Sequence, residues 1–310
     1  MTKRILLATR GTATADAAVR IAAALAARHS ARVEVFAVLE PLPIFDGGFA
    51  PAIIPFDSFD QRRSDELLAR VRGQVRAVTG SADAWPIDVR VGRPAAEIAR
   101  ASRAHDVMLV VLGVGRHKPA DRLFGNETAL KVSRLAPVPV LAVAPGRDQL
   151  PRRVIAATDF SASSLEAART ALRFLPAPGT LVLAHVSPEL EIPPVALEEW
   201  LTQYARGVRE GFANAKAHLA APAGITVQTA SLAGDAAQEI LQLAERMRAD
   251  LIAVGSHGHN LVERILIGSV ATKVLRLATC SVLLVPAKLQ AMEDEAEHER
   301  RNHAIPAAVG

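Results

Sequence analysis

The sequence predicts an α/β fold with two tandem domains, each a doubly wound sheet of five parallel strands. An internal repeat is the first reason, because residues 92–98 match residues 234–240 and residues 131–136 match residues 273–278, both with a spacing of 142 residues. The second reason is a set of short, continuously apolar segments between helical patterns, which is typical of parallel strands buried on both faces. The length of 310 residues also agrees with about two domains.

The domain boundaries follow from a further match, in which residues 3–9 resemble residues 152–158. We therefore expect one domain over residues 1–147 and a second over residues 152–287. A charged tail over residues 288–310 follows. Its alternating acidic and basic residues favour a solvated helix or a frayed end over a docking arm.

The order of strands and helices is clearest in the second copy. Strands are expected at Val154–Ala157, Thr180–Val186, Ile225–Ala230, Leu251–Val254 and Val282–Val285. Helices are expected at Ser163–Leu175, Leu190–Leu219 and Ala236–Arg248, the first of them with a capping box formed by Ser163 and Glu166. In the first copy, Pro41–Phe59 is rich in Pro, Phe, Gly and Asp and predicts a long irregular loop.

The cysteine content indicates the compartment. The single cysteine, Cys280, excludes an internal disulfide and fits a reducing environment, so we expect a cytoplasmic protein. The first residues pass directly into a strand pattern without the apolar core of a signal peptide, and no segment has the roughly 18 apolar residues that span a bilayer. No membrane partner is expected.

The charge balance gives little support for nucleic-acid binding. The net charge is +4, from 36 Lys and Arg against 32 Asp and Glu, and the basic residues are scattered along the chain. The densest basic cluster, Arg116 to Lys118 with Arg122, is interpreted as a solvated loop because no aromatic residues are interleaved with it. We therefore expect no nucleic-acid partner.

The most informative segment follows the apolar run Leu251–Val254. It contains Gly255 and Gly258 and then, after nine further residues, Gly268 and Ser269. A strand, a glycine loop and a helix start in this order can hold phosphate, because the glycines permit close approach and positive φ and the first helical amides lack internal acceptors. The alternative is a tight connection in which the glycines serve only packing.

The fold places this segment beside another loop. Thr158 and Asp159 end the first strand of the second copy, and Gly255 ends the fourth. Doubly wound sheets bind ligands beyond the carboxyl ends of their strands, where the winding direction switches. If the first and fourth strands are neighbours, both loops open onto one crevice.

With these residues the chain resembles the universal stress proteins, in their tandem form with two domains in one chain. The resemblance extends from about Lys3 to Ala287 and is carried by the pattern G-x2-G-x9-G-S/T, here Gly255, Gly258, Gly268 and Ser269. In relatives with this pattern, ATP binds in a crevice between the first and fourth strands. The resemblance therefore implies an ATP-binding protein with a regulatory or stress-resistance role. Any magnesium would enter the site bound to ATP.

The resemblance also implies a role for individual residues. Thr158, Asp159 and Val186 would lie near the adenine, with Asp159 as a hydrogen-bond acceptor. The adenine and ribose would face Val254 and Gly255, and the phosphates would be held by Gly258, Gly268, Ser269 and Val270. Asp159 has an alternative interpretation as a turn or helix-start residue ahead of Ser161.

The first copy departs from the pattern. Asn126 stands at the repeat position of Gly268 and Glu127 at that of Ser269, and a slip of one residue leaves Glu127 among the phosphate-facing positions. A carboxylate there repels a triphosphate unless it is neutralised. Arg10 stands where the second copy has the strand-end aspartate. We hypothesise that the first half has lost ATP binding and serves structure, interaction or another ligand.

Residues suited to catalysis are few. His257 and His259 lie in the glycine loop and are interpreted as pocket-shaping residues, because a metal site needs more ligands than this spacing supplies. Asp159 and Glu263 are candidates for assisting a magnesium ion, but neither has the setting of a water-activating base. The sequence lacks a P-loop lysine and a nucleophile elbow. We expect slow or absent ATP hydrolysis, and we assign no catalytic residue and no metal site.

The resemblance extends to assembly. It implies that the last strands, Val138–Val143 and Val282–Val285, pair the two halves about a pseudo-twofold axis, and that two chains form a homodimer. Two other functions stay open: an interaction module in which both crevices are vestigial, and, third, a weak ATPase. The residues do not distinguish ATP from AMP.

Overall fold

The computed structural model describes residues 2–41, 56–104, 106–115, 119–187, 194–256 and 267–286. Gly258, His257, His259, Glu263 and the tail over residues 288–310 lie outside the described residues.

Each half contributes five strands. Those of the first half are β1 (Arg4–Ala8), β2 (Arg32–Leu39), β3 (Ile87–Val91), β4 (Val107–Gly113) and β5 (Val140–Val143). Those of the second half are β6 (Arg153–Ala157), β7 (Gly179–Ser187), β8 (Ile225–Ala233), β9 (Leu251–Gly255) and β10 (Ser281–Val285).

The helices alternate with the strands along the chain. The first half has the short 3-10 helix η1 (Ala13–Ala15) and the helices α1 (Asp16–His29), α2 (Phe56–Thr79), α3 (Pro94–Ala101) and α4 (Pro119–Leu135). The second half has α5 (Ala162–Phe174), α6 (Pro194–Leu219), α7 (Ala236–Arg246) and α8 (Ser269–Leu277).

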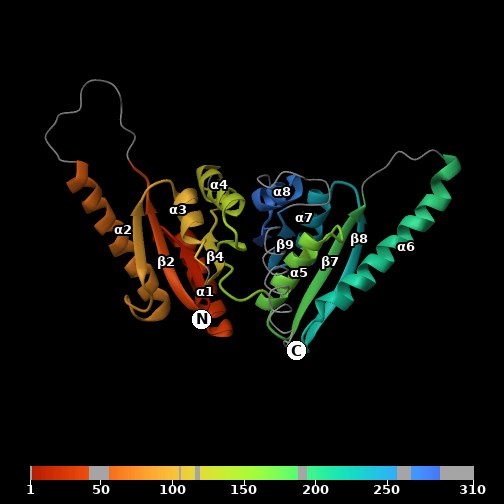
Figure 1. The fold of residues 1–310 in the computed structure, drawn as a ribbon, viewed down its shortest axis with the longest axis horizontal. Helices are drawn as coiled ribbons and strands as arrows, with labels where there is room; N and C mark the ends of the chain where they lie inside the picture. Colours follow the sequence, from red (N-terminus) through yellow and green to blue (C-terminus); the bar gives the residue numbers. More distant parts are fainter. Residues whose placement is uncertain are drawn as a thin grey trace, which may run out of the picture.

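All ten strands form one sheet, in the order β3-β2-β1-β4-β5-β10-β9-β6-β7-β8 (Figure 1). Within each half the pairings are parallel, and the first strand lies between the second and the fourth. The predicted α/β fold with two doubly wound halves is confirmed, and so is the adjacency of the first and fourth strands. The strand order of one half is the reverse of that of the other, as a pseudo-twofold relation requires.

The two halves meet at an antiparallel pair of strands. β5 pairs with β10, and Leu141 lies opposite Leu283 at the centre of the pair. Leu141 is 4% exposed and Leu283 is fully buried. The prediction that the last strands pair the two halves is therefore confirmed, and the two predicted sheets are joined into one.

Helices cover both faces of the sheet. One core contains residues of α1, α2, α5 and α6, and the other contains residues of α3, α4, α7 and α8. Adjacent residues of β9 alternate between them, because Leu251 and Ala253 belong to the first core and Ile252 and Val254 to the second. Each core includes strands from both halves, so apolar packing crosses the junction.

Two predicted boundaries are wrong. Helix α5 begins after Ser161, whose hydroxyl accepts a hydrogen bond from the Ser164 amide at 3.3 Å, so Ser161 and not Ser163 caps it. Glu166 does not complete a capping box but forms an ion pair with Arg169 one turn along the helix. Residues 42–55 of the predicted loop at 41–59 lie outside the described residues, and the predicted end of the loop is wrong, because α2 already begins at Phe56.

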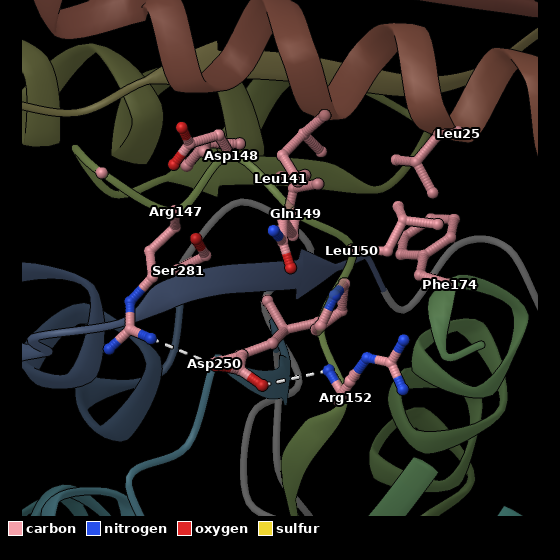
Figure 2. Close-up of a pocket in the computed structure, with 15 residues that line it drawn as sticks. Leu25, Leu141, Arg147, Asp148, Gln149, Leu150, Arg152, Phe174, Asp250 and Ser281 are labelled. Carbon is pink, nitrogen blue, oxygen red and sulfur yellow. Dashed lines mark hydrogen bonds and ion pairs between the residues drawn. The ribbon is translucent and has the colours of Figure 1, made fainter. Parts of the chain in front are cut away.

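A cavity of about 310 Å³ lies on one side of the junction, next to the segment that links the halves (Figure 2). Polar groups at its rim form hydrogen bonds and ion pairs with one another. The Asp250 carboxylate accepts hydrogen bonds from the amides of Arg152 and Arg153, both at 3.0 Å, and pairs with the Arg147 guanidinium at 3.1 Å. These contacts fix the linker to the start of β9.

Candidate functional site

The loop after β6 lies at the carboxyl end of the sheet, where the sequence predicts one wall of the second-half crevice. Thr158 continues the sheet ladder, since its amide donates to the Ala184 carbonyl at 2.8 Å, and its side chain is 6% exposed. The Asp159 carboxylate accepts a hydrogen bond from the Ser161 amide at 3.0 Å and another from the Ser161 hydroxyl. Asp159 therefore has the turn role that was one of its two predicted interpretations, and it lies half-buried beside the helix start.

The residue after Asp159 has an unusual conformation. Phe160 has φ of 63°, in the left-handed region that non-glycine residues rarely adopt. Its ring stacks on His185 with centroids 4.6 Å apart and meets Phe212 edge-on at 5.1 Å. These contacts hold the loop against α6.

His185 connects this loop to α6. Its Nδ1 donates to the Thr158 carbonyl at 2.9 Å, and its Nε2 lies 2.9 Å from the Tyr204 hydroxyl. A neutral ring with Nδ1 protonated satisfies both contacts. The sequence does not predict this cluster, because its members are far apart in the chain. The one signal is a histidine next to Val186, a residue predicted to contact the ligand.

Apolar residues form the other wall. Val254 is 2% exposed, and the half-buried Val186 and Val270 pack against the same core. The structure thus brings three of the predicted contact residues to one face of the sheet, at the carboxyl ends of β7 and β9 and the start of α8. An apolar surface of this kind suits a flat aromatic ring.

Gly255 ends β9, and its lack of a side chain has a packing reason. A Cβ there would lie 3.1 Å from the Ser163 carbonyl oxygen. Gly255 is not among the residues with positive φ, so it does not use the conformational freedom that a glycine permits there. Gly113 has the same constraint in the first half, where a Cβ would lie 2.7 Å from Ala15 Cα.

Gly268 differs, because no residue that the structure describes requires a glycine there. Among the described residues, a Cβ would meet only the Ser256 carbonyl oxygen, at an ordinary 3.5 Å. Gly268 is the N-cap of α8, its amide donates to the Ser256 carbonyl at 2.8 Å, and its own carbonyl accepts from the Thr272 amide at 3.0 Å. The amides of Ser269 and Val270 therefore open the helix without intrahelical acceptors, and Ser269 is exposed.

The corresponding helix of the first half is arranged differently. Glu127 forms an ion pair with Arg276 of α8 across the junction, at 2.5 Å, so the carboxylate predicted to repel phosphate is neutralised by the other half. Asn126 is 6% exposed, and its Oδ1 has no hydrogen-bond donor among the described residues. Ser269, the repeat counterpart of Glu127, carries no charge with which to form the reciprocal pair.

Within the described part of the chain, no group of three or more His, Cys, Asp or Glu side chains has the geometry of a metal site. In the same part, every helix is too short or too polar to cross a membrane.

Comparison with known proteins identifies the family. The profile of the Universal stress protein family matches twice, over residues 1–144 and 151–286. The chain belongs to the universal stress protein family. A universal stress protein from Methanocaldococcus jannaschii is 32% identical over 142 residues, which cover 44% of this chain and 84% of that protein. A homolog of universal stress protein A from Coxiella burnetii is 44% identical over 55 residues, which cover 18% of this chain and 38% of that protein.

Solved structures agree on the fold of this universal stress protein. A universal stress protein from Archaeoglobus fulgidus superposes with a TM-score of 0.61 at 20% identity, covering 91% of this chain and 96% of that one. A functionally unknown protein from Pseudomonas aeruginosa superposes with a TM-score of 0.57 at 16% identity, covering 96% of this chain and 98% of that one. At these identities the likeness concerns the fold alone, and it extends over both halves.

Proposed function

We propose that the second half binds ATP, or a related adenine nucleotide, in the crevice between β6 and β9. Gly268 carries the proposal, because it is a helix-capping glycine that packing against the described residues does not require. Glycine at this position leaves room for a phosphate beside the free amides of α8. The pattern of glycines and the family membership support the same ligand.

The base would occupy the opposite end of the crevice. Val186 and Val254 supply an apolar surface, and the Asp159 carboxylate lies at the carboxyl end of β6 beside it. In the proposed complex this carboxylate accepts a hydrogen bond from the adenine amine, and Gly255 faces the adenine and ribose. The phosphates are held by Gly258, Gly268, Ser269 and Val270. Thr158 positions Asp159 through the ladder bond to β7.

The role that follows is regulatory, with nucleotide occupancy as the signal and with little or no hydrolysis. The proposed compartment is the cytoplasm, in keeping with a single cysteine, Cys280, which is buried. The proposed homodimer of chains needs another surface than β5 and β10, because these strands are already paired with each other within the chain. Static light scattering on the purified protein tests the dimer.

Calorimetric titration with ATP and magnesium tests the nucleotide site. We expect one nucleotide per chain, and Gly268→Glu, which introduces the first half's carboxylate, lowers affinity at least about tenfold by charge repulsion. Gly207→Glu is the matched control, because it adds the same charge on exposed α6, where a Cβ meets nothing within 4 Å. Unchanged affinity in Gly268→Glu contradicts the proposed phosphate position.

A different result distinguishes the alternatives. Absence of ATP binding by nucleotide-free protein favours the interaction module, in which Gly255 serves packing and Asp159 only its turn. Release of phosphate at a rate that Gly268→Glu abolishes favours the weak ATPase.

A further inference from the structure

The first half contains its own cavity, of about 420 Å³, where β1, β2 and β4 end. Its location matches the switch point at which doubly wound sheets bind ligands. The floor is apolar and is formed by Ala8, Phe36, Val38, Ile98 and Leu112. Each of these residues belongs to the core beneath. A cavity of this size and lining is suited to a small molecule with an apolar body.

Among the described residues, the rim of this cavity carries more positive than negative charge. Arg10 and Arg70 line it together with one acidic residue, Glu40. Both arginines are exposed, and neither forms a hydrogen bond or an ion pair with any residue that the structure describes. Two guanidinium groups facing one carboxylate attract an anionic group, and a guanidinium binds a carboxylate with two parallel hydrogen bonds.

The arginines stand on a fixed frame. The Gln74 side chain is 8% exposed; it accepts from the Thr9 hydroxyl at 2.7 Å and donates to the Thr12 carbonyl at 2.7 Å. It also donates to the Asp16 carboxylate at 2.6 Å. This buried network ties the loop that bears Arg10 to α2, which bears Arg70.

Gly11 brings the same two segments into close contact. It has φ of 69°, and a Cβ there would lie 2.9 Å from the backbone carbonyl carbon of Arg70. The loop and α2 are therefore packed too tightly at this point to admit a side chain. Together with Gln74, this contact preorganises the positive rim.

The polarity of this cavity is the reverse of that in the second half. Arg10 follows the first strand where the second half has Asp159, so a donor replaces an acceptor. At the other end, Glu127 replaces Ser269 and is held by Arg276. A nucleotide oriented as in the second half would place its base beside the Arg10 guanidinium, where the second half has the Asp159 acceptor. The lining therefore suits a ligand whose negative end faces β1 and α2 better than it suits ATP.

We propose that the first-half cavity binds a small amphipathic carboxylate, with its apolar body over Phe36, Val38 and Leu112 and its carboxylate between Arg10 and Arg70. The proposal does not depend on nucleotide binding in the second half. It assigns the first half a ligand site of different chemistry.

Titration calorimetry of the full chain with three eight-carbon probes tests this assignment. Octanoate, octanol and octylammonium share an apolar body and differ in charge, so they separate burial from charge recognition. We expect octanoate to bind at one site per chain, at least about tenfold more tightly than the other two. Arg10→Gln and Arg70→Gln each weaken octanoate about tenfold, and Arg72→Gln, an exposed arginine of α2 outside the cavity lining, leaves it unchanged.

Four outcomes overturn the proposal. They are absence of octanoate binding at millimolar concentration, equal binding of octanol or octylammonium, unchanged octanoate affinity in both cavity variants, and displacement of octanoate by ATP. The last outcome makes the first-half cavity a nucleotide site. Loss of ATP binding in the Gly268→Glu variant with octanoate binding intact supports both assignments separately.

Discussion

In both halves the loop after the first strand packs closely against a helix. The glycine at this contact lies in the loop in the first half and in the helix in the second. In the first half Gly11, two residues after Thr9, lets the loop approach the backbone of Arg70. In the second half Phe160, two residues after Thr158, occupies the corresponding place with φ of 63° and lies against Gly211 of α6. Although only the first half has its glycine in the loop, the loop contains a residue with positive φ in both halves.

This exchange predicts opposite effects for two glycines of one helix. Gly211→Ala places a Cβ 2.9 Å from the Phe160 ring and displaces that ring from His185, so we expect the free energy of unfolding to fall by about 1–2 kcal/mol. Gly207→Ala, one turn earlier with nothing within 4 Å, gains helix propensity and should raise it by up to about 1 kcal/mol. Urea unfolding of both variants measures the difference. Equal stabilisation by both alanines would show that the Phe160 contact imposes no constraint.

At the scale of elements, the apolar segments and the repeat were enough to predict the strands and their neighbours in the second half. Element ends were predicted less well, because local hydrogen bonds decide them: Ser161 rather than Ser163 caps α5. The glycine pattern located the candidate site. It could not reveal that Ser163 requires the glycine at 255 whereas no described residue requires the glycine at 268, because this depends on tertiary contacts. For the same reason it could not reveal that Glu127 meets Arg276, 149 residues away.

Helices α1 and α5 also meet across the junction, and a histidine lies in that contact. The His29 ring packs edge-on against Phe174 with centroids 6.1 Å apart, and its buried Nε2 has no hydrogen-bond partner among the described residues. The neighbouring Arg28 donates to the Leu175 carbonyl at 3.0 Å. Burial, and then the charge of Arg28, lower the pKa of His29 below its ordinary value of 6.5.

This shift predicts how stability changes with pH. The unfolded chain binds a proton at His29 more tightly than the folded chain does. The contribution of this contact to the free energy of unfolding is therefore complete above pH 6.5, and it is lost as the pH falls from there toward the folded-state pKa. We expect unfolding free energy to decrease on acidification in this window, and His29→Gln to reduce the slope. His218→Gln, at an exposed histidine of α6, is the control. If the unfolding free energy of wild type and of His29→Gln changes with pH at the same slope, His29 does not cause this pH dependence.

At the scale of the whole molecule, the continuous sheet makes the two halves one mechanical unit. Strands β5 and β10 are paired, Leu141 and Leu283 are buried, and each of the two cores includes strands from both halves. If one half unfolded, the other could therefore keep little of its apolar surface covered. The Arg276 and Glu127 pair adds little to this coupling, because their side chains are 54% and 36% exposed.

A ligand bound to one half should therefore stabilise the entire chain. We expect a single thermal transition in calorimetry, and ATP with magnesium at about 100 times its dissociation constant should add about 2.7 kcal/mol to the free energy of that one transition. Gly268→Glu should keep the single transition, and the same ATP concentration should add at most about 1.4 kcal/mol, because the affinity is at least about tenfold lower. Two separate transitions, of which ATP raises only one, would show instead that the halves unfold independently and that the β5 and β10 pair joins them without coupling them.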